Sequence, residues 1–292
     1  MYRFILLLTV LTLAACNKVH IPENESRLVV EGWIEDGRFP VMLVTSSVPV
    51  SLEPQELESL EDHIVRWAKV SVNDGEKEII MAGGPDNSYF PPYSYTTARM
   101  RGRAGGTYEL KVEYQGQTVT SATTIPAKKS LEYLKVESIP PADTSFRIVA
   151  GIRDDEKTSD RYKFFIRKEG KDSSYISSFL GLLKDEEMDD TVYETPIYNN
   201  ISVNSSVFEQ FFSADDVIYI RFSTLDNTSW EYWNDYDEIQ ALSRNPFIPS
   251  SKKIRTNING GFGCWAGYGS TYYKVSIPDS LASGRVFRMQ TR

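Results

Sequence analysis

Apolar and polar residues alternate along much of the chain, and a period of two is typical of half-buried β-strands. The clearest example is a glycine-led run at residues 105–114, in which Tyr108, Leu110, Val112 and Tyr114 alternate with polar residues. Further strand-like stretches occupy residues 27–34, 39–45, 64–72, 77–81 and 117–124. Together these runs predict about seven strands before Pro126, at the spacing expected of a β-sandwich.

Two local signals refine the prediction for this first part of the chain. The sequence Asn73-Asp74-Gly75 lies between two strand-like runs and predicts a tight β-hairpin. The strand that carries Tyr108 resembles the tyrosine-corner strand of immunoglobulin-like sandwiches. We therefore expect residues 25–126 to form an immunoglobulin-like β-sandwich, with the Tyr108 ring buried and its hydroxyl hydrogen-bonded.

The rest of the chain, residues 127–292, predicts a second antiparallel β domain. Its strand-like runs are residues 131–139, 145–153, 161–168, 217–224, 271–277 and 286–289. Between them, residues 226–229 offer helix caps and Asn245-Pro246 offers a stop, so we expect one short helix at about 230–243. The predicted fold class is mainly β, with an N-terminal sandwich and a second β domain that carries one helix.

The start of the chain predicts a lipid anchor. A basic Arg3 precedes a short apolar run, which ends in Leu13-Ala14-Ala15-Cys16. The run is too short to span a bilayer, which takes roughly 20 residues, and it reads as a secretory signal. We expect residues 1–15 to be removed, Cys16 to be lipidated, and residues 16–24 to form a polar tether. The alternative is an ordinary cleaved signal followed by a chance cysteine.

Charge and cysteine content exclude several classes of function. The net charge of −8 argues against nucleic-acid binding, because phosphates require clustered Lys and Arg. With Cys16 lipidated, Cys264 has no partner in the chain, so neither a disulfide framework nor a multi-cysteine zinc site is expected. The apolar surroundings of Cys264 indicate a buried, unreactive thiol.

Catalytic signatures are weak. The histidines are His20 in the tether and His63 beside an acidic stretch, and no Gly-x-Ser-x-Gly motif is present. The acidic residues 185–190 lack the alternating spacing of a calcium loop, which leaves either a solvated loop or a calcium site. The glycines at 260, 261 and 263 are interpreted as permitting tight turns or close backbone packing. We expect no enzymatic activity, no metal and no cofactor.

Aromatic side chains supply the candidate binding residues. Tyr89, Phe90, Tyr93 and Tyr95 lie in a proline-containing stretch, and a rigid loop of this kind is a common recognition surface. The alternative is that these rings cover the rim of the sandwich. On the predicted helix, Tyr232 and Tyr236 are one turn apart and are candidates for exposure, whereas Trp230 and Trp233 are expected to pack the helix onto the sheet.

Several motifs resemble the Bacteroidetes lipoproteins that are grouped as domain of unknown function 4249. They are Ile21-Pro22 with Leu28-Val29-Val30-Glu31-Gly32, then Ala68-Lys69-Val70-Ser71-Val72-Asn73-Asp74-Gly75, then Gly106-Thr107-Tyr108-Glu109-Leu110-Lys111-Val112 with Thr124-Ile125-Pro126, and lastly Asn245-Pro246-Phe247 with Asn257-Ile258-Asn259-Gly260-Gly261-Phe262-Gly263. The likeness covers essentially the whole mature chain, and Cys264-Trp265 departs from the plainer apolar pair expected there. The family offers no catalytic residues to transfer.

The resemblance implies a lipid-anchored protein of the outer membrane, on its periplasmic or its extracellular face. Members look like accessories of TonB-dependent barrel transporters, so the implied partners are the membrane, such a barrel and a nutrient ligand. We therefore expect a non-enzymatic accessory in nutrient binding or uptake. The alternative is a structural or adhesive surface lipoprotein without a transport role, and an envelope hydrolase is a weaker third class.

Overall fold

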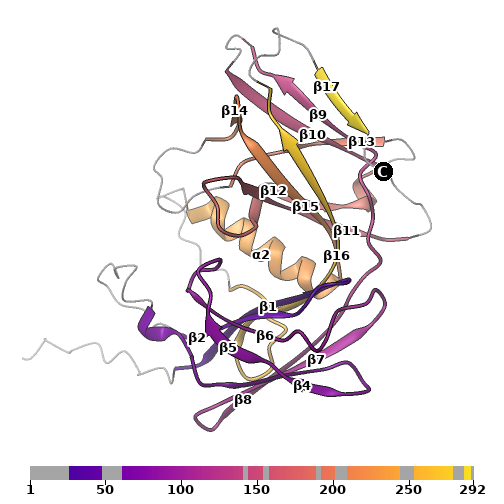
Figure 1. Ribbon diagram of the computed structural model, residues 1–292. Helices are drawn as coiled ribbons and strands as arrows, with labels where there is room; N and C mark the ends of the chain where they lie inside the picture. Colours follow the sequence, from indigo (N-terminus) through magenta and orange to yellow (C-terminus); the bar gives the residue numbers. More distant parts are fainter. Residues whose placement is uncertain are drawn as a thin grey trace, which may run out of the picture.

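The computed structural model describes residues 26–47, 61–140, 144–153, 158–188, 192–200, 209–243, 253–278 and 286–290. Residues 1–25 lie outside these ranges, and with them the predicted signal, Cys16 and the tether. The described part of the chain is mainly β, as predicted, and is built from three sheets and one long helix (Figure 1).

The strands of the three sheets come from both halves of the sequence. The largest sheet has eight strands, in the order β12 (Ile176–Lys184), β11 (Arg161–Lys168), β15 (Val217–Leu225), β16 (Phe262–Ser276), β1 (Leu28–Glu35), β2 (Val41–Ser46), β6 (Tyr93–Thr96) and β5 (Ala82–Pro85). The four-stranded sheet has the order β4 (Glu78–Ile80), β3 (Lys69–Asn73), β7 (Thr107–Tyr114) and β8 (Gln117–Thr124). The five-stranded sheet has the order β13 (Val192–Ile197), β10 (Ser145–Arg153), β9 (Tyr133–Ser138) and β17 (Val286–Gln290), and β14 (Phe212–Ser213) pairs with β10.

The two smaller sheets bury the same face of the large sheet. Val30 and Ile34 of β1 belong to one core with residues of β3 and β7, under the four-stranded sheet. Phe164 of β11 and Ile220 of β15 belong to a second core, shared with residues of β9 and β10 of the five-stranded sheet. Because successive side chains alternate between faces, the residues in between, such as Trp33, point to the opposite face.

Two local predictions for the first half are confirmed, the hairpin at Asp74-Gly75 and the burial of Tyr108, whereas the strand expected at 64–72 forms only at Lys69–Asn73. β3 and β4 form an antiparallel hairpin, in which the Asp74 carboxylate accepts hydrogen bonds from the backbone N–H groups of Glu76 and Lys77, and Gly75 has a φ of 90°. Tyr108 is 3% exposed, and its hydroxyl accepts a hydrogen bond of 2.9 Å from the Arg103 N–H. The immunoglobulin-like strand arrangement itself stays a prediction.

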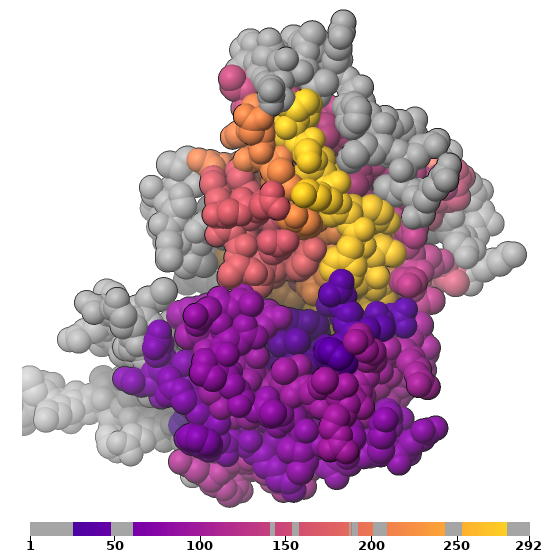
Figure 2. All heavy atoms as spheres, in the orientation of Figure 1, coloured from indigo at the N-terminus to yellow at the C-terminus, as the bar shows by residue number. Residues whose placement is uncertain are grey.

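The C-terminal strand β16 connects the two halves of the molecule. It pairs with β15 in antiparallel orientation and with β1 in parallel orientation, with Glu31 opposite Cys264. Trp265 is fully buried in the core of the first half, where its indole N–H donates to the Tyr108 carbonyl at 2.9 Å. In Figure 2 the indigo atoms of the first described residues touch the yellow atoms near the C-terminal end of the chain. The predicted boundary at residue 126 stays a prediction, but the core of the first half includes a residue from far beyond it.

Gly263 explains how β16 approaches β1 so closely. Its φ is +105°, and a Cβ atom there would lie 1.9 Å from the Val30 carbonyl oxygen. Gly260 also has a positive φ, of +85°. The interpretation of these glycines as turn and close-packing residues is therefore confirmed.

The helix α2 (Asn227–Ser243) begins three residues earlier than the expected Trp230. The Asp226 carboxylate accepts a hydrogen bond of 2.7 Å from the Ser229 N–H, and the Asp226 carbonyl accepts one of 3.0 Å from the Trp230 N–H. Asp226 therefore caps the helix, and its other carboxylate oxygen accepts from the Thr123 hydroxyl of β8 at 2.9 Å. Within the described ranges, no helix is both long and apolar enough to cross a membrane.

The stretch at residues 185–190 is only partly described. Lys184 ends β12, and the short 3₁₀-helix η2 (Asp185–Glu187) follows. Asp185 is buried and its carboxylate accepts a hydrogen bond from the Asp160 N–H, so this residue is part of the packing and not of a solvated loop. Asp189 and Asp190 lie outside the described residues.

Candidate functional site

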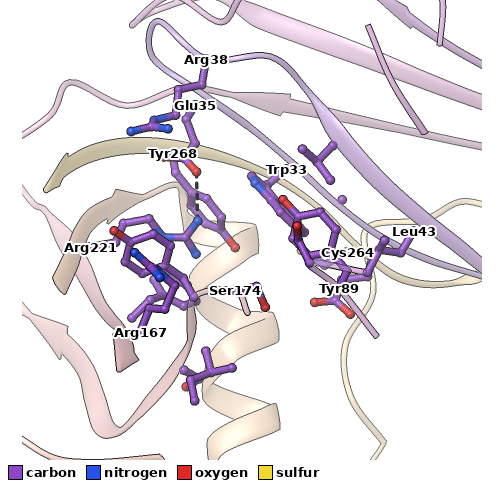
Figure 3. A pocket seen from close by; sticks show the side chains of 18 of the residues that line it. Trp33, Glu35, Arg38, Leu43, Tyr89, Arg167, Ser174, Arg221, Cys264 and Tyr268 are labelled. Atoms are coloured by element: carbon purple, nitrogen blue, oxygen red, sulfur yellow. Dashed lines mark hydrogen bonds and ion pairs between the residues drawn. The ribbon is translucent and has the colours of Figure 1, made fainter. Parts of the chain in front are cut away.

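A cavity of about 790 Å³ lies between the two halves, on the face of the large sheet that the smaller sheets leave free. We call it the junction cavity. One side is formed by β1, β2 and residues 88–90; the other by β11, β15, β16, α2 and residues 173–177. The alternation along β1 places Glu31, Trp33 and Glu35 on the cavity side, while Val30 and Ile34 face the core. The close-up of the site is shown in Figure 3.

The helix α2 provides an aromatic wall. Trp233 and Tyr236 line the cavity, with their rings 5.3 Å apart in an edge-to-face arrangement. Trp233 also packs edge-on against Phe165, and its indole N–H donates to the Tyr268 hydroxyl at 2.9 Å. It therefore packs the helix onto the sheet, as expected, and contributes to the cavity as well.

Two ion pairs, each with one buried partner, hold this helix in place. Lys163 of β11 is fully buried and its ammonium group donates to the Asp237 carboxylate at 2.6 Å. Asp235 is also fully buried, and its two carboxylate oxygens accept from the Arg255 guanidinium at 2.7 and 2.9 Å. An unpaired charge at Lys163 or Asp235 would be costly. These contacts therefore fix the position of α2 and of the aromatic wall that it carries.

The opposite wall carries Tyr89 and Phe90. The Tyr89 ring packs edge-on against Trp33 at a centroid distance of 5.4 Å, whereas Phe90 is 53% exposed. Asp86 shapes this loop, since its carboxylate accepts from the Ser88 N–H and from the Ser94 hydroxyl, both at 3.0 Å. These hydrogen bonds lower the pKa of the Asp86 carboxyl against the opposing effect of burial.

A buried ion pair lies at one end of the cavity. The Arg221 guanidinium donates to the Glu35 carboxylate at 2.9 Å, and both side chains are more than 90% buried. The guanidinium also lies 3.9 Å from the centre of the Phe165 ring, and the second Glu35 oxygen accepts from the Tyr272 hydroxyl. Figure 3 shows Arg221 with Glu35, and Arg38 and Arg167 near them.

Glu31 stands apart from this network. Its carboxyl lines the cavity and remains accessible, yet protein surrounds it, and burial raises its pKa above the ordinary range. The hydroxyl of Tyr232 has a pKa well above its usual value, first because of burial and then because of the nearby Glu31 charge. The pKa of Tyr236 is raised by burial too.

The structure brings together four of the six aromatic candidates. Tyr89, Phe90, Tyr232 and Tyr236 all line the junction cavity, although the first two and the last two are more than 140 residues apart in the chain. Tyr232 and Tyr236 are partly buried and not freely exposed on the helix. Their role in binding stays a prediction.

Tyr93 and Tyr95 do not line the cavity, and the structure corrects the expectation for Tyr95. It is 2% exposed in the core; its hydroxyl donates to the Val65 carbonyl at 2.6 Å, and burial raises its pKa to about 12. Tyr93 is partly buried against Tyr95, and its hydroxyl donates to the Arg66 carbonyl at 2.9 Å. Tyr95 therefore belongs to the hydrophobic core of the first half, and Tyr93 packs against that core.

Sequence reasoning missed the charged residues of the cavity. Glu31, Glu35 and Arg221 each interrupt an otherwise apolar strand, and Glu31 and Glu35 share one face of β1 with Trp33. An ionisable residue in a central strand is rarely buried without a partner or a function. Charged residues within these apolar strands were therefore the sequence signal that could have indicated the site. Cys264 also lines the cavity; it is 4% exposed, and burial raises the pKa of its thiol.

A metal site is not formed by the part of the chain that the structure describes. No group of three or more His, Cys, Asp or Glu residues within it is arranged to hold an ion. The His63 ring is engaged in a hydrogen bond of 3.0 Å with the Ser46 hydroxyl, and His20 lies outside the described residues.

The fold and the cavity define a mainly β protein whose two halves enclose a space of ligand size. The family model described as "Domain of unknown function (DUF4249)" matches residues 17–274, and the chain belongs to this family. No curated protein matches the sequence.

Among solved structures, the chain is similar to the crystal structure of a DUF4785 family protein from Legionella pneumophila. The identity is 10% and the TM-score is 0.21, over 70% of this chain. The chain spans about half the length of that protein, at 53%.

Proposed function

We propose that this protein is a lipid-anchored protein of the outer membrane that binds a small organic ligand in the junction cavity. The observation that carries the proposal is the cavity itself. Its volume of about 790 Å³ falls within the range of small-molecule sites, which is about 300–1,000 Å³. Its lining of aromatic rings with a few fixed charges has the composition of such sites.

The side chains that line the site also favour binding over a purely structural role. A structural junction would bury its apolar side chains and pair its charges, as the Arg221–Glu35 pair does at 2.9 Å. Trp33, Tyr236 and Glu31 instead line an open space. Aromatic side chains bind flat or apolar groups with little loss of conformational entropy.

Anchoring and the transport role complete the proposal. The Leu-Ala-Ala-Cys sequence that ends at Cys16 supports lipidation, and lipid chains would concentrate the protein beside other membrane proteins. The resemblance to outer-membrane lipoproteins of the Bacteroidetes supports a TonB-dependent barrel as the partner. The cavity would then capture a nutrient and present it to that barrel.

Ligand binding is tested on protein purified from its own membranes. Native mass spectrometry should detect a bound small molecule, which denaturation releases. The Tyr236→Ala variant should retain much less of it, because an aromatic anchor contributes about 2 kcal/mol, or roughly thirtyfold in affinity. The matched control is Trp67→Ala, since Trp67 is 87% exposed and does not line the cavity. Absence of any bound molecule, or equal retention by both variants, would contradict the proposal.

The transport role is tested by affinity purification from detergent-solubilised membranes. A TonB-dependent barrel should co-purify with the wild-type protein, and much less of it with Cys16→Ser. Purification without any barrel would favour the structural or adhesive alternative.

A further inference from the structure

The junction cavity has opposite charges at its two ends. At one end, Glu31 lies opposite Cys264 of β16 and Leu43 of β2, and all three residues line the cavity. Its carboxylate has no ion pair or hydrogen bond within the described part of the chain. No nearby charge there counteracts the effect of burial on this carboxylate. A cation from outside the protein would therefore gain a carboxylate that nothing else occupies.

Aromatic rings surround this acidic end. Trp33 follows Glu31 on the same face of β1 and contacts Tyr89. Besides burial, the Glu31 charge raises the pKa of both Tyr232 and Tyr236, which shows that these side chains are close to it. The two tyrosine rings are stacked on each other, with their centres 6.5 Å apart. A carboxylate among aromatic faces is the arrangement that binds ammonium groups, because the ring faces and the carboxylate both attract positive charge.

The other end of the cavity is basic. Arg221 is neutralised by Glu35, but Arg38 and Arg167 line the cavity without a carboxylate partner among the described residues. Each guanidinium is stacked on a tyrosine ring at 4.1 Å, Arg38 on Tyr272 and Arg167 on Tyr219. Stacking holds the planar guanidinium in place, so its N–H groups are available for bidentate binding of a carboxylate.

The two ends are separated along β1. Glu31 and Glu35 are four residues apart on the same face, which corresponds to about 13 Å at roughly 3.3 Å per residue. Glu35 marks the basic end, because it accepts hydrogen bonds from Arg221 and from the hydroxyl of Tyr272, and Arg38 is stacked on the Tyr272 ring. In Figure 3 the arginines lie on one side of the cavity, and Leu43, Tyr89 and Cys264 lie on the other.

We propose that the ligand of the junction cavity is an elongated zwitterion, with an ammonium group at Glu31 and a carboxylate at Arg38 and Arg167. An extended tripeptide spans about 10–11 Å at roughly 3.3–3.6 Å per residue, so it fits between two ends that lie about 13 Å apart along β1 and bind it from beyond its termini. Its side chains would contact the aromatic wall of α2. This inference rests on the proposed binding function and specifies its ligand class.

The test uses four synthetic peptides and isothermal titration calorimetry. The probes are alanyl-tyrosyl-alanine with free ends, its N-acetyl form, its C-terminal amide, and the form that is blocked at both ends. The free peptide should bind, and each block should weaken binding about tenfold or more, as expected when a hydrogen bond to a charged group is lost. Free tyrosine should bind far more weakly than the tripeptide, because its two charges are too close together to reach both ends.

Variants assign each end of the peptide to its residue. Glu31→Gln should weaken the free peptide about tenfold but leave the N-acetyl form unchanged. Arg167→Gln should weaken the free peptide and leave the C-terminal amide nearly unchanged. Matched controls are Glu76→Gln and Arg66→Gln, both exposed residues outside the cavity, and these should alter no affinity.

The outcomes separate this inference from the proposed function. If the free tripeptide does not bind, or if the doubly blocked form binds equally well, the zwitterion assignment is overturned. Retention of an uncharged molecule by the purified protein would then still support ligand binding in the cavity. Equal effects of Glu31→Gln on the free and N-acetyl peptides would likewise reject the placement of the ammonium group.

Discussion

The ion pair between Arg221 and Glu35 should stabilise the junction between the two halves of the molecule. The residues are on β15 and β1, which flank β16 in the large sheet, and they are 186 positions apart in the chain. Replacing Arg221 with Met keeps the length and the apolar stem but removes the guanidinium. The Glu35 carboxylate would then be buried, with only the Tyr272 hydroxyl as a donor.

The expected cost follows from the burial of both partners. The Arg221 and Glu35 side chains are 8% and 5% exposed, so the pair is nearly out of water. Removing one partner of such a pair costs about 3–5 kcal/mol, because the other charge remains buried and uncompensated. In a protein of this size each kcal/mol lowers Tm by about 2–4 °C, so the Tm of Arg221→Met should fall by roughly 10 °C.

Urea denaturation followed by circular dichroism measures this free energy. The double variant Arg221→Met/Glu35→Gln should recover most of the loss, since it removes both charges. A matched surface control is Arg147→Met, whose pair with Glu137 is 2.6 Å long but has an Arg147 side chain that is 45% exposed. That control should cost at most about 1 kcal/mol. A loss below about 1 kcal/mol for Arg221→Met, or a double variant no more stable than the single one, would refute this reasoning.

Four further predictions concern single side chains. Tyr108→Ala should lose about 3–5 kcal/mol of stability in urea denaturation and Tyr108→Phe about 1, because the latter loses only the hydroxyl that accepts from the Arg103 N–H; equal losses would contradict this. Cys264 should react with DTNB only after denaturation, because burial raises the pKa of its thiol; rapid reaction of the native protein would show access to the thiol. Glu31→Gln should be more stable than the wild type at pH 7 but not at pH 4. Burial raises the pKa of the Glu31 carboxyl above 4.5, so the wild type is fully stable while this carboxyl is protonated and loses stability when the carboxyl ionises in the folded protein. A wild type that is more stable than Glu31→Gln at pH 7 would show that a partner stabilises the carboxylate. Cys16→Ser should leave the membrane fraction and carry no palmitate label; continued sedimentation with membranes would refute lipidation at this residue.

Much of the fold could be predicted because its local signals are strong. The alternation around Tyr108, the Asp74-Gly75 turn and the Asp226 cap each depend on nearby residues, and each has the predicted structure. The helix starts at Asn227 and not Trp230 because Asp226, immediately before it, supplies the capping carboxylate.

The connection between the halves could not be predicted in the same way. The parallel pairing of β16 with β1 joins residues more than 230 positions apart, and no local pattern specifies it. Trp265 reads as an apolar residue in a glycine-rich stretch, yet it completes the core around Tyr108. Long-range strand pairing depends on the packing of the whole sheet, so periodicity alone does not reveal the partner.

The candidate site was only partly predictable for the same reason. Composition identified Tyr89, Phe90, Tyr232 and Tyr236 as candidates, but only the fold shows that the four line one space. It also shows why Tyr95 is a core residue: its hydroxyl finds a buried acceptor, the Val65 carbonyl. Glu31 acquires its significance from the cavity around it, and neighbouring residues in the sequence contain no sign of that cavity.

The most direct measurement is a crystal structure of the protein purified from its own membranes, without added ligand. We predict electron density for a small molecule in the junction cavity, in contact with Tyr236 and with its charged groups directed to Glu31 and Arg167. A well-ordered cavity that contains only solvent, together with density for a bound molecule elsewhere on the protein, would contradict the assignment of this cavity as the binding site.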